Sequence, residues 1–206
     1  MSLVLVLGVG FASCSDDDDD ESTNYLKIGD KTYSLNAGML EDYGEVDEEG
    51  IFNMYLILHS SGLRYNSSIE DYEGKGELVA FNLLSGVEGD LEAGEYSFGM
   101  WEYPERLTYV SSEYYLGMDV EVADAFYDDL YEGTVEEDER PWIEGEMLGT
   151  LNVEKEGDTY IIDFSGMSDD FKVVEIHFQG KLGVLEFSDE DFYGSIKERS
   201  SGFSVR

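Results

Sequence analysis

The sequence has few basic residues, two histidines and a single cysteine, and these shortages exclude several classes of protein. Twelve Lys and Arg stand against 48 Asp and Glu in 206 residues, which gives a formal charge of −36. Nucleic acids and anionic lipid headgroups need cationic side chains to neutralise their phosphates, so we expect neither as a partner of the folded body. His59, His177 and Cys14 are too few for a zinc site, a disulfide framework or a Cys–His catalytic pair.

The N-terminus holds an apolar run of ten residues, 3–12. A membrane-spanning helix needs about 20 residues, whereas ten is the length of a signal-peptide apolar region. The run ends with the small residue Ala12, Ser13 and Cys14 follow it, and residues 16–21 are six consecutive acids. A buried N-terminal strand with a core cysteine is the alternative, but an acidic block of this kind stays solvated and disfavours it.

This order of apolar run, small residues, cysteine and acidic block resembles the N-terminus of Bacteroidetes surface lipoproteins. It departs from their usual pattern at Phe11, where leucine is usual, and in having no Lys or Arg before the apolar run. The resemblance covers about residues 3–21. It implies that residues 1–13 are a signal peptide, and that Cys14 carries lipid. It also implies that residues 14–24 tether the body to the outer membrane, facing the extracellular side, and it implies no activity.

Proline is scarce as well, with two residues, whereas 23 glycines recur between runs rich in Tyr, Val, Ile and Phe. That rhythm is typical of antiparallel β-structure. We predict one all-β domain over residues 25–187, a single antiparallel β-sandwich or flattened β-barrel of roughly eight to ten strands. The choice between the two stays open, and residues 188–206 form a tail of undefined order.

Alternation places the strands of this domain. Residues 25–28 and 31–35 form a hairpin around Gly29 and Asp30, and further strands are expected at 52–59, 77–84 and 95–98. Residues 147–155, 159–165 and 171–180 predict a meander. The segment 149–182 also resembles the closing strands of β-rich lipoproteins of the same group. One short helix is predicted from Val122, Phe126 and Leu130, four residues apart, ending at Gly133.

Catalytic and metal-binding motifs are missing from the sequence. No nucleophile elbow or phosphate loop occurs, so we predict no enzyme activity. Glu144, Glu146 and Glu175 lie on or beside predicted strands and are the candidates for a carboxylate pair, although solvent-facing positions on a half-buried sheet explain them better. Residues 41–49 and 124–139 are interpreted as acidic loops. Neither has EF-hand spacing, so we predict no cofactor and at most weak Ca²⁺ binding there.

Aromatic residues are the richest feature that remains, with seven between positions 96 and 115. Exposed Trp and Tyr rings bind sugars or anchor protein partners, whereas strands also bury aromatics in their core. The candidate ligand-binding residues are Trp101, Tyr103, Tyr109 and Trp142.

These features together predict a non-catalytic surface lipoprotein, anchored in the outer membrane through lipid on Cys14. Its partner would be an extracellular glycan or protein, bound through exposed aromatics. Two alternatives stay open: a structural envelope protein with no specific small ligand, and a carboxylate-dependent hydrolase. The oligomeric state is not indicated.

Overall fold

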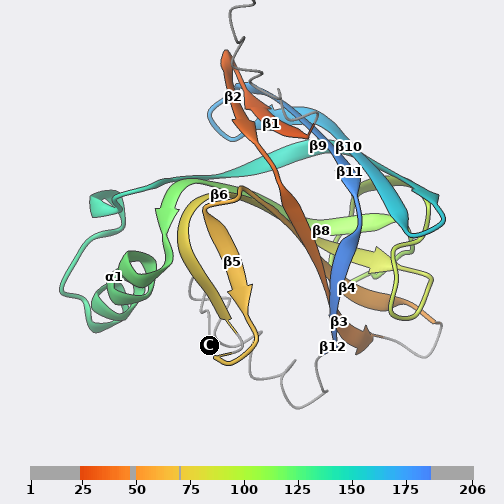
Figure 1. Cartoon of the computed structure of the whole chain (residues 1–206), viewed down its shortest axis with the longest axis horizontal. Coiled ribbons are helices and arrows are strands. Elements are labelled where there is room, and N and C mark those ends of the chain that lie inside the picture. Colours follow the sequence, from red (N-terminus) through yellow and green to blue (C-terminus); the bar gives the residue numbers. More distant parts are fainter. Residues whose placement is uncertain (1–23, 47–49, 70, 187–206) are drawn as a thin grey trace, which may run out of the picture.

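The computed structural model describes residues 24–46, 50–69 and 71–186, and within them β-strands predominate (Figure 1). The predicted signal peptide, the predicted lipid attachment site Cys14 and the C-terminal tail lie outside the described residues. The strands are β1 (Tyr25–Ile28), β2 (Lys31–Ser34), β3 (Ala37–Glu45), β4 (Phe52–His59), β5 (Leu63–Asn66), β6 (Asp71–Ser85), β7 (Gly94–Phe98), β8 (Thr108–Asp119), β9 (Ile143–Glu156), β10 (Thr159–Ser168), β11 (Val173–Gly180) and β12 (Leu182–Glu186). One α-helix, α1 (Val120–Glu132), and one 3₁₀ turn, Glu137–Glu139, complete the described elements.

The twelve strands form one sheet that curls into a half-barrel (Figure 1). Its order is β12-β3-β4-β6-β8-β7-β9-β10-β11-β1-β2, with β5 paired to β6 and a further pairing between β8 and β9. The predicted all-β class is therefore confirmed, with more strands than expected. The β1–β2 hairpin and the β9–β10–β11 meander pair as predicted. Two pairings, β7–β8 and β12–β3, are parallel, so the sheet is mixed and not purely antiparallel as predicted.

The inside of the half-barrel is filled by the first of two hydrophobic clusters. On β9, Leu151 and Val153 are buried, and on β10 so are Ile162 and Phe164, while the residues between them face outward. Period-two alternation of this kind buries one face of each strand. Each fully buried side chain of this size contributes about 1.5–3 kcal/mol, so this cluster dominates the stability of the sheet.

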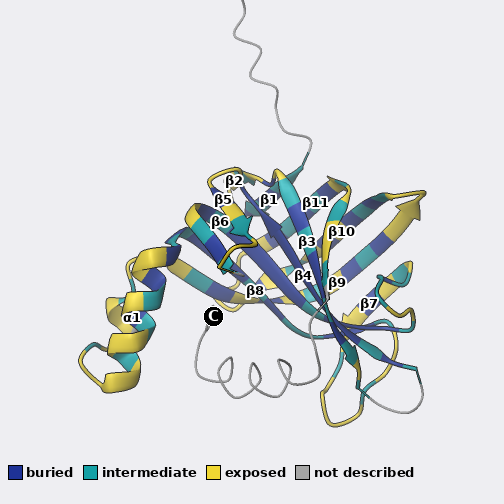
Figure 2. Cartoon of the chain, turned by 60° about the horizontal axis from the view of Figure 1, so that its bottom comes forward, coloured by how far each residue is buried: buried dark blue, intermediate teal, exposed yellow. Residues whose placement is uncertain are grey.

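A second hydrophobic cluster lies on the opposite face of β4, β6 and β8 and includes side chains of β5 and α1. Figure 2 shows how much of the central strands is buried. Strand β4 is buried on both faces, since Leu56 and Leu58 belong to the inner cluster and Tyr55 and Ile57 to the outer one. A strand covered on both faces is apolar throughout. The prediction that residues 52–59 form a central strand is thus confirmed.

The helix α1 lies where the sequence predicted it and is capped as predicted, at Gly133 with φ 73°. A left-handed residue at this point favours glycine, which has no Cβ to clash. Its buried side chains are Val120, Ala123 and Phe126. Phe126 and Leu130 of the predicted stripe pack in the second cluster, whereas Val122, expected on the same stripe, is 44% exposed.

The two acidic segments are not simply loops, and this corrects the sequence analysis. Most of residues 124–139 lie in α1 and the 3₁₀ turn. Glu41 lies within β3, is 5% exposed and accepts a hydrogen bond from the hydroxyl of Tyr43 at 2.7 Å. Residues 47–49 lie outside the described residues.

Candidate ligand-binding groove

The four predicted ligand-binding aromatics fall into two pairs in the structure. Trp101 and Tyr103 are 40% and 72% exposed and lie in the turn after β7. Tyr109 and Trp142 are buried, at 0% and 7%. Of the four candidates, only Trp101 and Tyr103 present their rings to solvent, and the assignment of Tyr109 and Trp142 as exposed ligand-binding residues is corrected.

Trp142 is part of the outer hydrophobic cluster. Its ring packs edge-on against Phe126 and Tyr127 of α1, with centroids 5.3 and 5.6 Å away. Its indole N–H donates to the Glu144 carboxylate at 3.3 Å, which also accepts from the Tyr127 hydroxyl and pairs with Arg140. The ring holds the helix against the sheet rather than facing a ligand.

Tyr109 closes a fork in the sheet. Strand β9 pairs with β8 up to Glu146 and with β7 from Leu151, so in the described part of the chain residues 147–150 have no partner strand on this side. The Tyr109 hydroxyl donates to Gly149 O and accepts from Gly149 N–H, both at 2.8 Å. The hydroxyl of Ser112 donates to Met147 O in the same gap. Side chains thus replace the missing backbone pairing.

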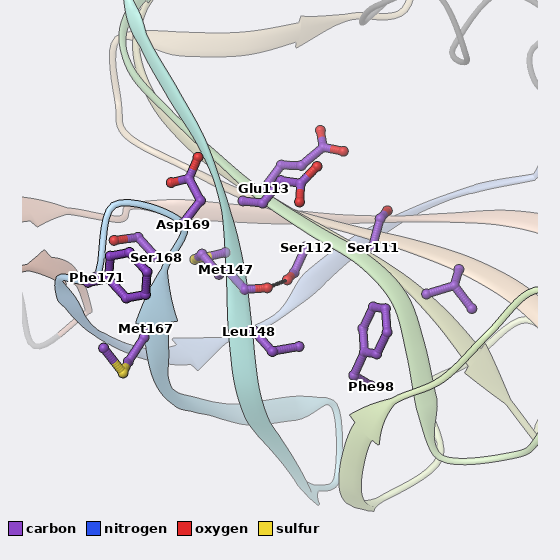
Figure 3. A pocket seen from close by; sticks show the side chains of 12 residues that line it. Phe98, Ser111, Ser112, Glu113, Met147, Leu148, Met167, Ser168, Asp169 and Phe171 are labelled. Atoms are coloured by element: carbon purple, nitrogen blue, oxygen red, sulfur yellow. Dashed lines mark hydrogen bonds between the residues drawn. The ribbon is translucent and has the colours of Figure 1, made fainter.

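A hollow of about 610 Å³ lies at this fork, between β8, β9 and the turn after β10 (Figure 3). A second hollow of about 400 Å³ lies toward the turn that carries Trp101. Both are lined by Phe98 and Val110, so they are neighbouring parts of one depression, which we call the groove. Its volume is in the range of small-molecule and peptide sites.

The groove is lined mainly by apolar side chains that are exposed to solvent. In Figure 3, Leu148 extends toward Phe98, while Met167 and Phe171 lie on the other side of β9. The exposed fractions of these four side chains run from 46% to 84%. Leu148, Met167 and Val173 are also cross-strand neighbours on β9, β10 and β11, and form an outward-facing apolar ladder. Apolar surface gathered in this way marks interaction sites.

These groove residues were missed in the sequence analysis, although the sequence carries a signal for them. Leu148 follows the buried Met147, and Met167 precedes the buried Ser168, so each is an apolar residue at an outward position of its strand. An apolar residue out of phase with the buried face, paired with another on the next strand, is the pattern that would have identified them.

The charged side chains of the groove are all acidic. Glu113, Glu146 and Asp169 line the larger hollow and Glu102 the smaller one, and the lining residues include no Lys, Arg or His. Glu113 and Glu146 are direct cross-strand partners, so their side chains leave the same face. Glu113 accepts a hydrogen bond from the Tyr115 hydroxyl at 2.6 Å. The two carboxylates oppose each other at one end of the hollow.

The smaller hollow has two amides beneath it. Asn53 of β4 and Asn82 of β6 line it, and Asn53 is 3% exposed. The side-chain oxygens of both residues are buried and have no hydrogen-bond partner among the described residues. A buried acceptor without a partner costs about 1–3 kcal/mol, so this end of the groove retains unused hydrogen-bonding capacity.

Phe171 adopts a backbone conformation that bulky residues avoid. Its φ is 63°, in the left-handed region, and its ring is 84% exposed. The turn is held by Ser168, whose hydroxyl accepts from Lys172 N–H at 3.1 Å and whose carbonyl accepts from Phe171 N–H at 2.9 Å. This backbone conformation costs about 1–2 kcal/mol of folding free energy. Because the ring is exposed, it adds little hydrophobic stabilisation to offset that cost.

The other residues considered for chemistry are held in structural contacts. Glu175 pairs with Lys27 at 2.9 Å, and His177 bonds Asp163 at 2.7 Å. His59 is buried, and its Nδ1 bonds Ser60 O at 2.9 Å. Within the described ranges, no group of three or more His, Cys, Asp or Glu side chains is arranged to hold a metal ion.

Comparisons with models of protein families, with curated proteins and with solved structures give no match for this chain. In the described part of the chain, no helix is both long and apolar enough to cross a membrane.

Proposed function

We propose that this protein is a non-catalytic binding protein of the cell surface, and that the groove binds its ligand, a glycan or a protein. The observation that carries the proposal is the groove itself. Exposed apolar side chains line it where the sheet forks, and unused hydrogen-bond acceptors lie at one end. Phe98 and Trp101 are aromatic residues that line the groove and would contact the ligand. Of the residues that the sequence suggested, Trp101, Tyr103, Tyr109 and Trp142, only Trp101 keeps this role.

The proposal includes attachment to the outer membrane through lipid on Cys14, with the body facing outward. Its support is the order of apolar run, cysteine and acidic block in residues 3–21. Several acyl chains on one cysteine hold a protein on a membrane, because each buried CH₂ contributes about 0.8 kcal/mol. Labelled palmitate is expected in the wild type and not in Cys14→Ser, and protease added to intact cells is expected to cleave the body. Label in the mutant would contradict the anchoring.

Binding is tested with the full chain on a glycan array and on a random-sequence peptide library. The groove variant Trp101→Ala/Leu148→Ser is compared with Val122→Ser/Tyr131→Ala, which removes exposed apolar side chains from α1 instead. We expect some ligands to bind the wild type and the α1 variant but not the groove variant. Equal binding by all three proteins, or no binding on either array, would overturn the proposal.

The structural-envelope alternative is less well supported, because a protein without a specific ligand has no use for a hollow of about 610 Å³ lined by exposed apolar residues. The hydrolase alternative keeps one supporting observation. Glu113 and Glu146 face each other beside a hollow, as a pair of catalytic carboxylates would. Hydrolysis of nitrophenyl glycosides that is lost in Glu146→Gln would favour this alternative.

A further inference from the structure

We propose that the ligand of the groove is a cationic polypeptide segment, in which Lys or Arg alternates with large apolar side chains. This inference rests on the proposed function, since it names the chemistry of the ligand at the same site. Charge, pairing geometry and the kind of apolar lining each support it.

The first argument is charge complementarity. Four carboxylates line the groove and no basic side chain does, in a chain whose formal charge is −36. Anionic ligands such as phosphates or acidic glycans are repelled from such a site, whereas a cationic ligand is attracted and steered toward it. The long-range attraction comes from the whole chain, but a choice among cationic ligands must come from the groove.

The second argument is the geometry of Glu113 and Glu146. Directly opposite residues of an antiparallel pair have Cβ atoms about 4.5–5.5 Å apart, and like charges in that position repel. A single ammonium or guanidinium group between the two carboxylates forms charge-assisted hydrogen bonds with both and offsets their repulsion. A neutral sugar hydroxyl can donate to either carboxylate but brings no positive charge to the pair.

The third argument is the apolar lining. Met167 and Leu148 form a cross-strand pair beside Phe171, and Met100 lies next to Trp101 in the smaller hollow. Methionine adapts its shape to apolar side chains of different kinds, and surfaces rich in it bind varied peptides. Sugar recognition relies instead on flat aromatic faces with polar groups around them. The larger hollow combines the flexible side chains of Leu148 and Met167 with the exposed rings of Phe98 and Phe171, a mixed apolar surface that suits Leu, Ile or Phe side chains of a peptide.

The two hollows also set a minimum size for the ligand. They meet at Phe98 and Val110, with the carboxylate pair beside the larger one and the Asn53 and Asn82 amides beside the smaller one. One amine or one sugar ring fills only part of this space. A peptide segment fills both hollows with successive apolar side chains and brings backbone N–H donors to the acceptors along the way.

The test uses fluorescein-labelled twelve-residue peptides in fluorescence polarisation with the full chain. One alternates Leu and Lys, and three controls replace Lys by Gln, Lys by Glu, or Leu by Ser. We expect the Leu–Lys peptide to bind at least ten times more tightly than the Gln or Ser controls, and the Glu control not to bind. Binding to the Ser control at the affinity of the Leu–Lys peptide would show attraction to net charge alone and overturn the proposal.

Matched protein variants separate the groove from the rest of the acidic surface. Glu146→Gln is expected to lower the affinity for the Leu–Lys peptide several-fold, whereas Glu154→Gln is expected to leave that affinity within two-fold of the wild type. Glu154 is also an exposed acid of β9, but its partner on β10 is Ile161. Leu148→Ser is expected to weaken binding as well. Equal losses in Glu146→Gln and Glu154→Gln would overturn the assignment.

The remaining outcomes distinguish this inference from the proposed function. A neutral glycan that binds the wild type and not Trp101→Ala/Leu148→Ser would keep the groove as a binding site and overturn the cationic peptide. A dimer that forms with concentration and is lost in the same variant would assign the groove to a second copy of the chain, and would also overturn it. No binding by peptides or glycans would overturn both proposals.

Discussion

Glu113 and Glu146 lie directly opposite each other on the antiparallel strands β8 and β9, at the edge of the larger hollow. Like charges in this position weaken a sheet. Phe171, in a left-handed conformation with an exposed ring, lines the same hollow. Features that cost stability and gather at one site are typical of function, because binding and stability make different demands on a side chain.

Removing one charge of the pair is expected to stabilise the protein. Glu146→Gln should raise the free energy of unfolding by about 0.2–1 kcal/mol in low salt, because the repulsion between β8 and β9 is relieved. The gain should shrink in high salt, which screens the repulsion. Urea denaturation at two salt concentrations measures it. Glu154→Gln, opposite Ile161, is the control. An equal gain in the control would contradict the pairwise origin.

Relieving the backbone strain at Phe171 is expected to have a similar effect. Phe171→Gly should raise the free energy of unfolding by about 1 kcal/mol, because glycine adopts φ 63° without a Cβ clash. Phe171→Ala removes the same ring but keeps the strain, so it should give no gain. Thermal unfolding of both variants shows whether the gain comes from removing the exposed ring or from relieving the backbone strain. If alanine stabilises as much as glycine, the exposed ring and not its conformation is the source.

Tyr109 is predicted to support the sheet and not to bind ligand directly. In Tyr109→Phe, Gly149 N–H and O lose their partner at the fork, and we expect a loss of about 1–3 kcal/mol in unfolding free energy. Burial raises the pKa of the Tyr109 hydroxyl, so it stays protonated and able to donate at neutral pH. Denaturant titration measures the loss. Unchanged stability would mean that water replaces the hydroxyl.

The two tryptophans are expected to respond differently to truncation. Trp142→Ala opens a cavity between α1 and the sheet and should cost about 3–5 kcal/mol of unfolding free energy. Trp101→Ala removes a ring that is 40% exposed and should cost far less, while weakening ligand binding. Chemical denaturation of the two variants gives the comparison. Similar losses would contradict the placement of Trp142 in the outer cluster.

The sequence predicted the meander and the β1–β2 hairpin well, because their pairing is local and their alternation is clean. The parallel pairing of β7 with β8 and the burial of Trp142 depend on contacts between distant segments, which alternation does not encode. The groove was missed for a related reason. Leu148 and Met167 meet only across the β9–β10 register, and the strain at Phe171 exists only in the folded backbone.

Asp71 gives the clearest dependence of stability on pH. Partial burial, with Asp124, Glu41 and Glu73 nearby, raises its pKa from 3.8 to about 6, although a hydrogen bond from Tyr72 N–H opposes the shift. The folded chain therefore holds this proton more tightly than the unfolded chain does. Stability falls as the pH rises from about 4 to about 6, and the loss persists at higher pH.

Asp71→Asn is expected to remove this loss while keeping an oxygen that accepts from Tyr72 N–H. The variant should match the wild type when the pH is well below 3.8, because both side chains are then uncharged in the folded and the unfolded chain. It should become more stable than the wild type as the pH passes 6, because only the wild type must bury a carboxylate close to Asp124 and Glu41. Urea denaturation across this range measures the difference. A gain of the same size at every pH would contradict the titration of Asp71 and point to packing instead.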